Sequence, residues 1–170
     1  MIKTNRLVLR PMDINDLNDI YEYSSSPTIS QFMYFRRTDD VNQMKEYISN
    51  CIEQYNKKNI DIHSLSIVYN NKVIGEIALL FFEEGPELFW IISEQYQNQG
   101  FAYEAATAYI KYIKDNFSIS KISAHCDTKN IPSRKLMEKL GFKYFKEDVR
   151  IYPDDRSPSR EYSYELLLNE

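Results

Sequence analysis

The sequence has few residues of the kinds that define disulfide-rich, metal-binding or nucleic-acid-binding proteins. Only two cysteines, Cys51 and Cys126, occur in 170 residues, and their spacing matches neither a disulfide framework nor a zinc motif. Acidic residues outnumber basic ones, and a formal net charge of -4 gives no basic surface for nucleic acid. No apolar run approaches the roughly 18 residues that cross a bilayer. We expect a cytoplasmic protein without a metal, a membrane segment or a nucleic-acid partner.

The spacing of apolar residues predicts one α/β domain over residues 1–170. Its sheet is expected to be mixed and mostly antiparallel, with about seven strands, about four helices and one parallel pair formed by residues 88–92 and 122–126. Proline at position 11 is expected to stop the first strand, and residues 24–38 have no clear period, so they form a short strand or a loop over a site. The other strands are predicted at residues 7–9, 65–69, 73–82, 142–149 and 161–168, and the helices around residues 14–21, 41–55, 105–113 and 133–140.

Glycine is also scarce, and one of the four glycines occupies an unusual position. Gly75, Gly85 and Gly141 fit ordinary hairpin or helix-end positions, whereas Gly100 lies where a strand gives way to a helix. The first N–H groups of a helix lack partners inside it, so an anion placed there gains several donors and the positive end of the helix dipole. A small residue at Ala102 lets a phosphate approach the backbone. A tight connection without a ligand is the alternative interpretation, and a P-loop is excluded because no Gly-Lys-Ser/Thr follows.

The residues around Gly100 resemble a known family. Gln97-x-x-Gly100-x-Ala102, followed by Glu104-Ala105, is similar to the pyrophosphate-binding motif of the GNAT superfamily of N-acetyltransferases, which reads Gln/Arg-x-x-Gly-x-Gly/Ala. Two further segments are similar to the branch that acetylates ribosomal-protein N-termini: Asn5-Arg6-Leu7-Val8-Leu9-Arg10-Pro11 with Asp16-Leu17, and Asn130-x-x-Ser133-x-x-Leu136-Met137-x-x-Leu140-Gly141-Phe142. These motifs occur in the expected order, so the resemblance spans the whole chain.

The resemblance implies that the co-substrate is acetyl-CoA and that the two parallel strands splay apart around it. It places the pantetheine against the backbone of Ile91 and Ile92. Asn130 is the expected cap of the helix at residues 133–140 and a candidate contact of the cofactor or of a backbone near it. Asn98 stands where many members carry glycine, and asparagine tolerates a left-handed backbone better than other residues do. The coenzyme diphosphate is expected on a continuous run of seven residues, namely Gln97, Asn98, Gln99, Gly100, Phe101, Ala102 and Tyr103.

The catalytic residues are less evident from the sequence. The resemblance implies direct attack by the amine and points to Ser133 as the proton donor to the departing thiolate, because Met137 stands where other branches place a tyrosine. A plain serine in the first turn of its helix is the alternative for Ser133. His125 and Glu76 are candidate bases. The alternatives are a hydrogen-bonded surface residue for His125 and a solvent-facing or salt-bridged residue for Glu76. Cys126 is expected in the core, because no recognisable motif places a base beside it.

The acceptor remains open at this point. Tyr34, Phe35, Phe81 and Phe82 could wall an acceptor groove or simply pack in the core and at its rim. The acceptor is a protein N-terminal amine or a small amine such as a polyamine, an amino sugar or an amino-acid derivative. A non-catalytic coenzyme A sensor is the alternative from another class of protein. The chain is expected to be a monomer or a homodimer.

Overall fold

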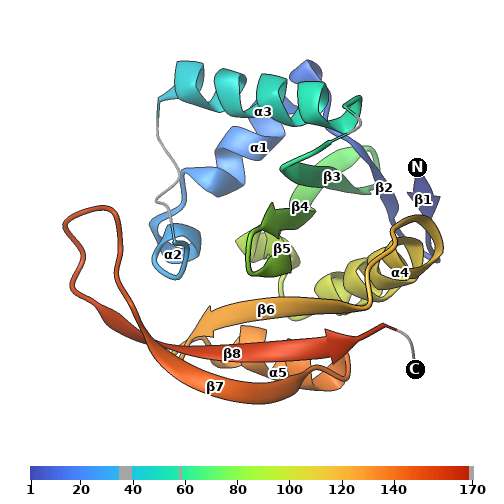
Figure 1. Ribbon diagram of the computed structural model, residues 1–170. Helices are drawn as coiled ribbons and strands as arrows, with labels where there is room; N and C mark the ends of the chain where they lie inside the picture. The colour runs from blue at the N-terminus through green and yellow to red at the C-terminus, as the bar shows by residue number, and fades with distance from the viewer. Residues whose placement is uncertain (35–39, 58, 169–170) are drawn as a thin grey trace.

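The computed structural model describes residues 1–34, 40–57 and 59–168. One sheet orders its strands β1-β2-β3-β4-β5-β6-β8-β7, and among the described pairs only β5 and β6 run parallel (Figure 1). The predicted mixed α/β sheet is confirmed, with eight strands where about seven were expected. The strands are β1 (Ile2–Lys3), β2 (Val8–Pro11), β3 (Ile62–Tyr69), β4 (Lys72–Phe82), β5 (Gly85–Ile92), β6 (Lys121–Asp127), β7 (Lys143–Arg150) and β8 (Ser159–Leu167).

Helices cover both faces of the β2–β5 part of the sheet, so the molecule has two apolar cores (Figure 1). Helices α1 (Leu17–Ser24) and α3 (Val41–Tyr55) close one core, which contains Ile20, Met44 and Ile48. Helix α4 (Phe101–Asn116) closes the other, with Ala105, Tyr109 and Ile113 facing inward. A strand covered on both faces is expected to be apolar throughout, which explains the nearly continuous apolar run of β4. Among the described residues, no helix has the length and apolar character needed to traverse a bilayer.

The differences from the predicted elements lie mainly in the first 30 residues. The strand predicted at residues 7–9 is β2, and it ends at Pro11 as expected, with Pro11 still paired with Leu65 of β3. Strand β1 contains only two residues, too few to show an alternating pattern. Part of the segment without a clear period forms the short helix α2 (Pro27–Ser30), which Ser26 caps and which starts with proline, a signal that the periodicity analysis missed.

The remaining short elements lead into the site. The 3-10 helix η1 (Ile14–Asp16) follows its N-cap Asp13, which forms a capping box with Asp16. A second 3-10 helix, η2 (Glu94–Tyr96), connects β5 to the turn before α4. Helix α5 (Ile131–Lys139) follows β6, and Asn130 caps it by accepting the N–H of Ser133 at 3.2 Å.

Candidate active site

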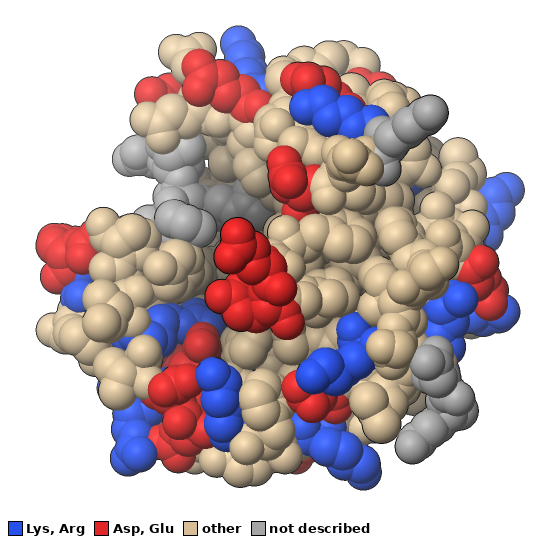
Figure 2. Space-filling model, in the orientation of Figure 1, with Lys and Arg blue, Asp and Glu red and all other residues tan. Residues whose placement is uncertain are grey.

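The parallel strands β5 and β6 are paired at a single position, Glu87 opposite Ser123, and have no other paired residues in the described part of the chain. Beyond this position the two strands separate, and the space between them opens into a cavity of about 1300 Å³. The space-filling view shows the molecule hollowed on this side, with acidic side chains beside the hollow (Figure 2). The separation of the two strands therefore creates a large concavity.

The turn before α4 lines one end of this cavity. Asn98 has φ 59° and Gly100 has φ 80°, so both residues adopt a left-handed backbone, which asparagine was expected to tolerate at position 98. Glycine is needed at position 100 for this conformation rather than for space, because the nearest atom to an added Cβ would be 3.5 Å away on Arg6. Within the described residues, none of the backbone N–H groups of residues 98–103 donates to a protein acceptor. The turn thus presents unpaired donors at the start of a helix, where an anion binds.

The opening segment of the chain supports this turn from outside. Glu104 in the first turn of α4 accepts hydrogen bonds from the Arg6 backbone N–H at 2.8 Å and from the Thr4 hydroxyl at 2.6 Å. The Arg6 guanidinium pairs with Glu104 at 2.7 Å and donates to the Gln99 carbonyl at 3.0 Å. These bonds hold the outer side of the turn and leave its N–H groups available.

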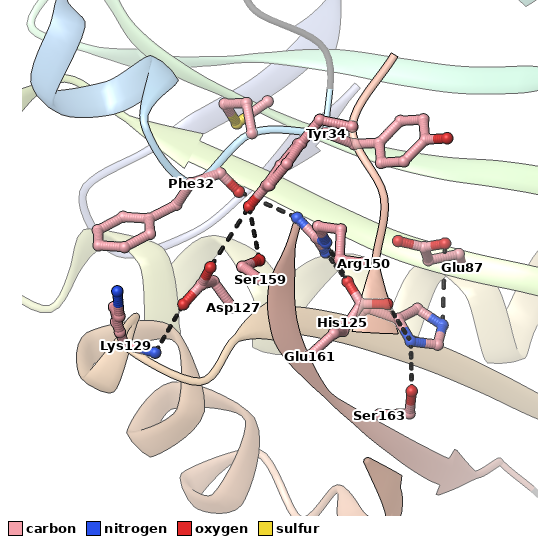
Figure 3. A network of polar contacts seen from close by, with 12 residues as sticks. Phe32, Tyr34, Glu87, His125, Asp127, Lys129, Arg150, Ser159, Glu161 and Ser163 are labelled. Atoms are coloured by element: carbon pink, nitrogen blue, oxygen red, sulfur yellow. Dashed lines mark hydrogen bonds and ion pairs between the residues drawn. The ribbon is translucent and has the colours of Figure 1, made fainter. Parts of the chain in front are cut away.

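Two titratable side chains from β5 and β6 face each other at the other end of the cavity. Nε2 of His125 lies 3.9 Å from Oε2 of Glu87, and Nδ1 lies 2.8 Å from the Ser163 hydroxyl (Figure 3). Burial lowers the pKa of His125 to about 4, and the charges of Arg150 and Lys146 act in the same direction. Burial raises the pKa of Glu87 to about 7, against the opposing effect of Arg150. At neutral pH the imidazole is therefore uncharged, whereas the carboxyl titrates.

Arg150, the last residue of β7, connects the acidic residues at this end of the cavity to the segment after α2, which forms part of the cavity wall. Its guanidinium forms an ion pair with Glu161 of β8 and donates to the Phe32 carbonyl at 3.1 Å (Figure 3). Arg156 continues the connection by donating to the carbonyls of Met33 at 2.7 Å and Tyr34 at 2.9 Å. The segment after α2 is thus fixed against the β7–β8 hairpin by backbone acceptors.

The cavity also collects residues from α5 and from the β6–α5 connection. Ser133 and Asn130 line it, together with Lys135 and Lys139. The amide of Asn130 is used as the helix cap, as expected, whereas no described residue bonds the Ser133 hydroxyl. Cys126 is 3% exposed, and burial raises the pKa of its thiol to about 11, so it is a core residue and not a thiolate.

Comparison with known proteins identifies the family. A family model described as an acetyltransferase (GNAT) domain matches residues 6–143, which is most of the chain. The chain belongs to the GNAT family of acetyltransferases. It is 27% identical to an uncharacterized N-acetyltransferase of Bacillus subtilis, YnaD, over 99% of this chain and 98% of the relative. The chain is therefore an enzyme that transfers an acetyl group from acetyl-CoA to an amine.

Solved structures of low identity share the fold. The ribosomal L7/L12 α-N-protein acetyltransferase RimL, crystallised with coenzyme A, superposes with a TM-score of 0.84 at 12% identity, covering 96% of this chain and 95% of that one. Spermidine N-acetyltransferase from Vibrio cholerae, in complex with coenzyme A and spermine, gives a TM-score of 0.80 at 18% identity and covers 96% of each chain. The same architecture thus occurs in enzymes named for a protein and for a polyamine, so the fold alone does not specify the acceptor.

The structure brings most of the predicted site residues of this acetyltransferase to one cavity. Gln99 and Phe81 do not line it, and the Phe81 ring lies 5.9 Å from Phe117 in the core instead. Phe35 lies outside the described residues. The predicted residues that line the cavity are Tyr34, Phe82, Ile91, Ile92, Gln97, Asn98, Gly100, Phe101, Ala102, Tyr103, His125, Asn130 and Ser133.

Glu76, the other predicted base, is 0% exposed and does not line the cavity. Its carboxylate accepts hydrogen bonds from Ser64 at 2.8 Å and from the Tyr47 hydroxyl. Tyr47 does line the cavity, so it separates Glu76 from the open space. Because the side chain is fully buried, Glu76 is not the solvent-facing residue that was one of the structural alternatives for it.

Glu87, Arg150 and Gly75 are among the residues that the sequence analysis missed. Glu87 sits directly before an apolar run, and an acidic residue at that position of a central strand is a signal that could have been noticed. Gly75 does not occupy a hairpin position: it lies within β4, where an added Cβ would meet the Ile91 carbonyl oxygen at 2.2 Å. The close approach of β4 to β5 therefore requires glycine there.

Proposed function

We propose that acetyl-CoA binds with its diphosphate on the N–H groups of residues 98–103 and that its thioester lies between β5 and β6. The left-handed residues Asn98 and Gly100 and the unpaired donors that they precede support this position. Ile91 and Ile92 line the same cavity on the strand that leaves its neighbour, which supports the expected pantetheine contacts of their backbone. The co-substrate supplies an activated acetyl group. The role of the protein is to hold the thioester beside the acceptor amine, to accept a proton from the amine and to donate one to the leaving thiolate.

Glu87 is the group that takes the proton from the acceptor amine. An ammonium ion cannot attack the thioester carbonyl, so one proton must leave the nitrogen before the C–N bond forms. A carboxylate with a pKa of about 7 is a suitable base near neutral pH, whereas an imidazole with a pKa of about 4 is a poor acceptor for that proton. His125 therefore acts beside Glu87 as an uncharged neighbour.

The pKa of Glu87 favours an α-amino group as the acceptor. Transfer from an α-amine with a pKa near 8 to a carboxylate with a pKa of about 7 is unfavourable by about one unit, or about 1.4 kcal/mol. For a lysine-type or polyamine nitrogen, with a pKa of about 10.4, the same transfer is unfavourable by about three units. We therefore infer that the enzyme acetylates an α-amine of a peptide, a protein or an amino-acid derivative, and that polyamines are poorer acceptors.

Ser133 assists the leaving group. When the C–S bond breaks, the coenzyme sulfur carries the electron pair as a thiolate and must take up a proton. The Ser133 hydroxyl has no partner among the described residues and lies in the first turn of α5, where the helix dipole favours negative charge. Both features support its role as donor to that sulfur.

One observation carries the proposal: a continuous cavity joins the unpaired N–H groups after Gln97 to the carboxyl of Glu87. The test measures thiol release with α-amine and polyamine acceptors for the wild type and Glu87→Gln between about pH 5.5 and about pH 9.5. We expect the wild-type kcat/KM to rise through about pH 7, and the variant to lose about 100-fold while acetyl-CoA affinity by calorimetry is retained.

Glu84→Gln, in the exposed β4–β5 turn, is the matched control and should retain wild-type rates. If Glu87→Gln keeps the wild-type rate and pH profile, Glu87 is not the base. A polyamine turned over faster than every α-amine would contradict the assigned acceptor class. A cytoplasmic location remains our expectation from the sequence.

A further inference from the structure

A row of apolar side chains lies beside Glu87 on one face of the sheet. Residues that pair across two antiparallel strands share a face, and Leu80 of β4 pairs both with Glu87 of β5 and with Ile62 of β3. Phe82 lies two residues beyond Leu80, so its side chain points to the same face. All three apolar residues line the cavity that contains Glu87. The proposed base therefore borders an apolar surface inside the same cavity.

This surface continues one of the two cores beyond the helices that close it. Ile62 packs against the core under α1 and α3, and so does Phe89, which lies two residues after Glu87 on the same face. Toward the end of β4 the side chains become accessible, and Phe82 is 54% exposed although it lines a cavity. A large apolar side chain that is exposed within a concave site is typical of a ligand-binding surface.

The segment after α2 adds apolar side chains to the same cavity. Phe32 and Met33 line it, and the carbonyls of these residues accept hydrogen bonds from Arg150 at 3.1 Å and from Arg156 at 2.7 Å. Because the backbone of this wall is already held, an apolar ligand does not have to order it on binding. Arg150 is also paired with Glu161, so an acidic ligand would have to compete with that carboxylate for the guanidinium.

The apolar surface lies at the opposite end of β5 from the proposed coenzyme turn. Glu87 is near the start of this strand, whereas the turn at residues 97–103 comes after its last residue, Ile92. The five residues from Glu87 to Ile92 span about 17 Å at about 3.3 Å per residue. The coenzyme diphosphate and the apolar surface therefore occupy separate parts of one cavity, which leaves the surface available to the acceptor.

We propose that this surface is a side-chain pocket for the acceptor, and that the enzyme prefers an α-amine whose own residue carries a large apolar side chain, as in leucine or phenylalanine. This inference rests on the proposed function, because it takes Glu87 as the base of an α-amine. The Cβ atoms of directly opposed residues lie about 5 Å apart. A side chain that is joined to the amine through one carbon therefore reaches Leu80 when the amine reaches Glu87.

The test compares kcat/KM for tripeptide amides that end in two glycines and differ only in the first residue, which is leucine, phenylalanine, glycine or aspartate. Their α-amines have similar pKa values, so the base contributes about equally to each reaction. Burial of the first side chain should favour the leucine and phenylalanine peptides over the glycine peptide by about 10- to 100-fold. The aspartate peptide should be the poorest, because its carboxylate would be buried among apolar groups beside Glu87.

Two substitutions in the pocket should change this preference in different ways. Phe82→Ala removes the exposed ring, so KM for the leucine and phenylalanine peptides should rise about tenfold and KM for the glycine peptide less than about twofold. Leu80→Phe narrows the pocket and should penalise the phenylalanine peptide most. Phe145→Ala removes an exposed ring of β7 that does not line the cavity, and this matched control should keep the wild-type preference.

Circular dichroism and the affinity for acetyl-CoA by calorimetry should be the same in the wild type and in all three variants. Equal kcat/KM for the four peptides would overturn the inference, as would a Phe82→Ala enzyme with the wild-type preference. A loss of acetyl-CoA affinity in Phe82→Ala would assign the surface to the coenzyme instead. Acetylation of α-amines without side-chain preference would contradict the pocket alone, whereas failure to acetylate any α-amine would contradict the proposed function as well.

Discussion

The two ends of the cavity are constructed differently. The end where we propose that the coenzyme binds, here the coenzyme end, is made by the backbone of one continuous segment, in which Asn98 and Gly100 are left-handed and the N–H groups of residues 98–103 are unpaired. The end where we propose that the amine binds, here the acceptor end, is made by side chains from four strands, with Glu87 on β5, His125 on β6, Arg150 on β7 and Glu161 on β8 (Figure 3).

This difference determines what each end can tolerate. Backbone donors do not depend on side-chain identity, so the coenzyme end fails when the chain cannot adopt the required φ angles or when a side chain fills the turn. The acceptor end depends on charged groups that shift one another's pKa through space. Substitutions there should therefore change the pH dependence of the reaction and the recognition of the acceptor. A constant coenzyme end beside an adjustable acceptor end suits a family that acetylates many amines.

Gly100→Asp should have the largest effect, because it adds a carboxylate beside the diphosphate and strains a left-handed backbone. We expect acetyl-CoA affinity by calorimetry to fall at least about 100-fold, or about 2.7 kcal/mol. Gly141→Asp is the matched control: it also has a positive φ, but its added Cβ would meet Leu166, away from the cavity. Equal affinities for the two variants would show that the diphosphate does not bind at this turn.

Gly75→Ala should act on folding rather than on the turn. The added methyl would lie 2.2 Å from the Ile91 carbonyl oxygen, so β4 and β5 must separate. We expect the free energy of unfolding in urea to fall by about 3 kcal/mol. At Gly85 nothing lies within 4 Å of an added methyl, so Gly85→Ala tests backbone strain without crowding. It should lower the free energy of unfolding by only about 1 kcal/mol. Similar losses for both would show that crowding at Gly75 is relieved.

Ser133→Ala should separate turnover from binding. Loss of the hydroxyl removes a donor that serves the departing sulfur, so kcat should fall about tenfold while the Kd of acetyl-CoA changes less than about twofold. Ser157→Ala, an exposed serine of the β7–β8 loop, should leave both quantities unchanged. If kcat and affinity fall together, Ser133 holds the coenzyme or the helix and gives the thiolate no proton.

The same contrast explains how much the sequence could predict. The turn at Gly100 was predictable because its donors, its glycine and its helix start lie within a few residues of each other. The mixed sheet and most of its strands were predictable for the same reason, since alternation is local. Glu87 and Arg150 lie far apart in the sequence, and the charge of Arg150 acts on Glu87 only because β5 and β7 belong to the same sheet, an arrangement that no local pattern records. The space around Gly75 depends likewise on the approach of a neighbouring strand.

Arg150→Met tests the acceptor end of the cavity, and its expected effect on kcat/KM is the smallest of these substitutions. The guanidinium favours the ionised form of Glu87 and so lowers the pKa that burial raises. Without this charge the pKa of Glu87 should rise further, by up to about one unit, and the carboxylate base would persist only at higher pH. The acidic limb of kcat/KM should therefore move to higher pH, with a larger loss at about pH 6 than at about pH 9.

Arg160→Met is the control for that shift, because the Arg160 side chain is 74% exposed and its partner is Glu147. It should leave the pH profile where it was. Arg150 also donates to the Phe32 carbonyl, so a variant that only loosened this wall would raise KM for the amine equally at every pH. A loss of kcat/KM that is the same at every pH would therefore show that Arg150 only supports the cavity wall. A shift of the acidic limb to higher pH would show that its charge sets the protonation of Glu87.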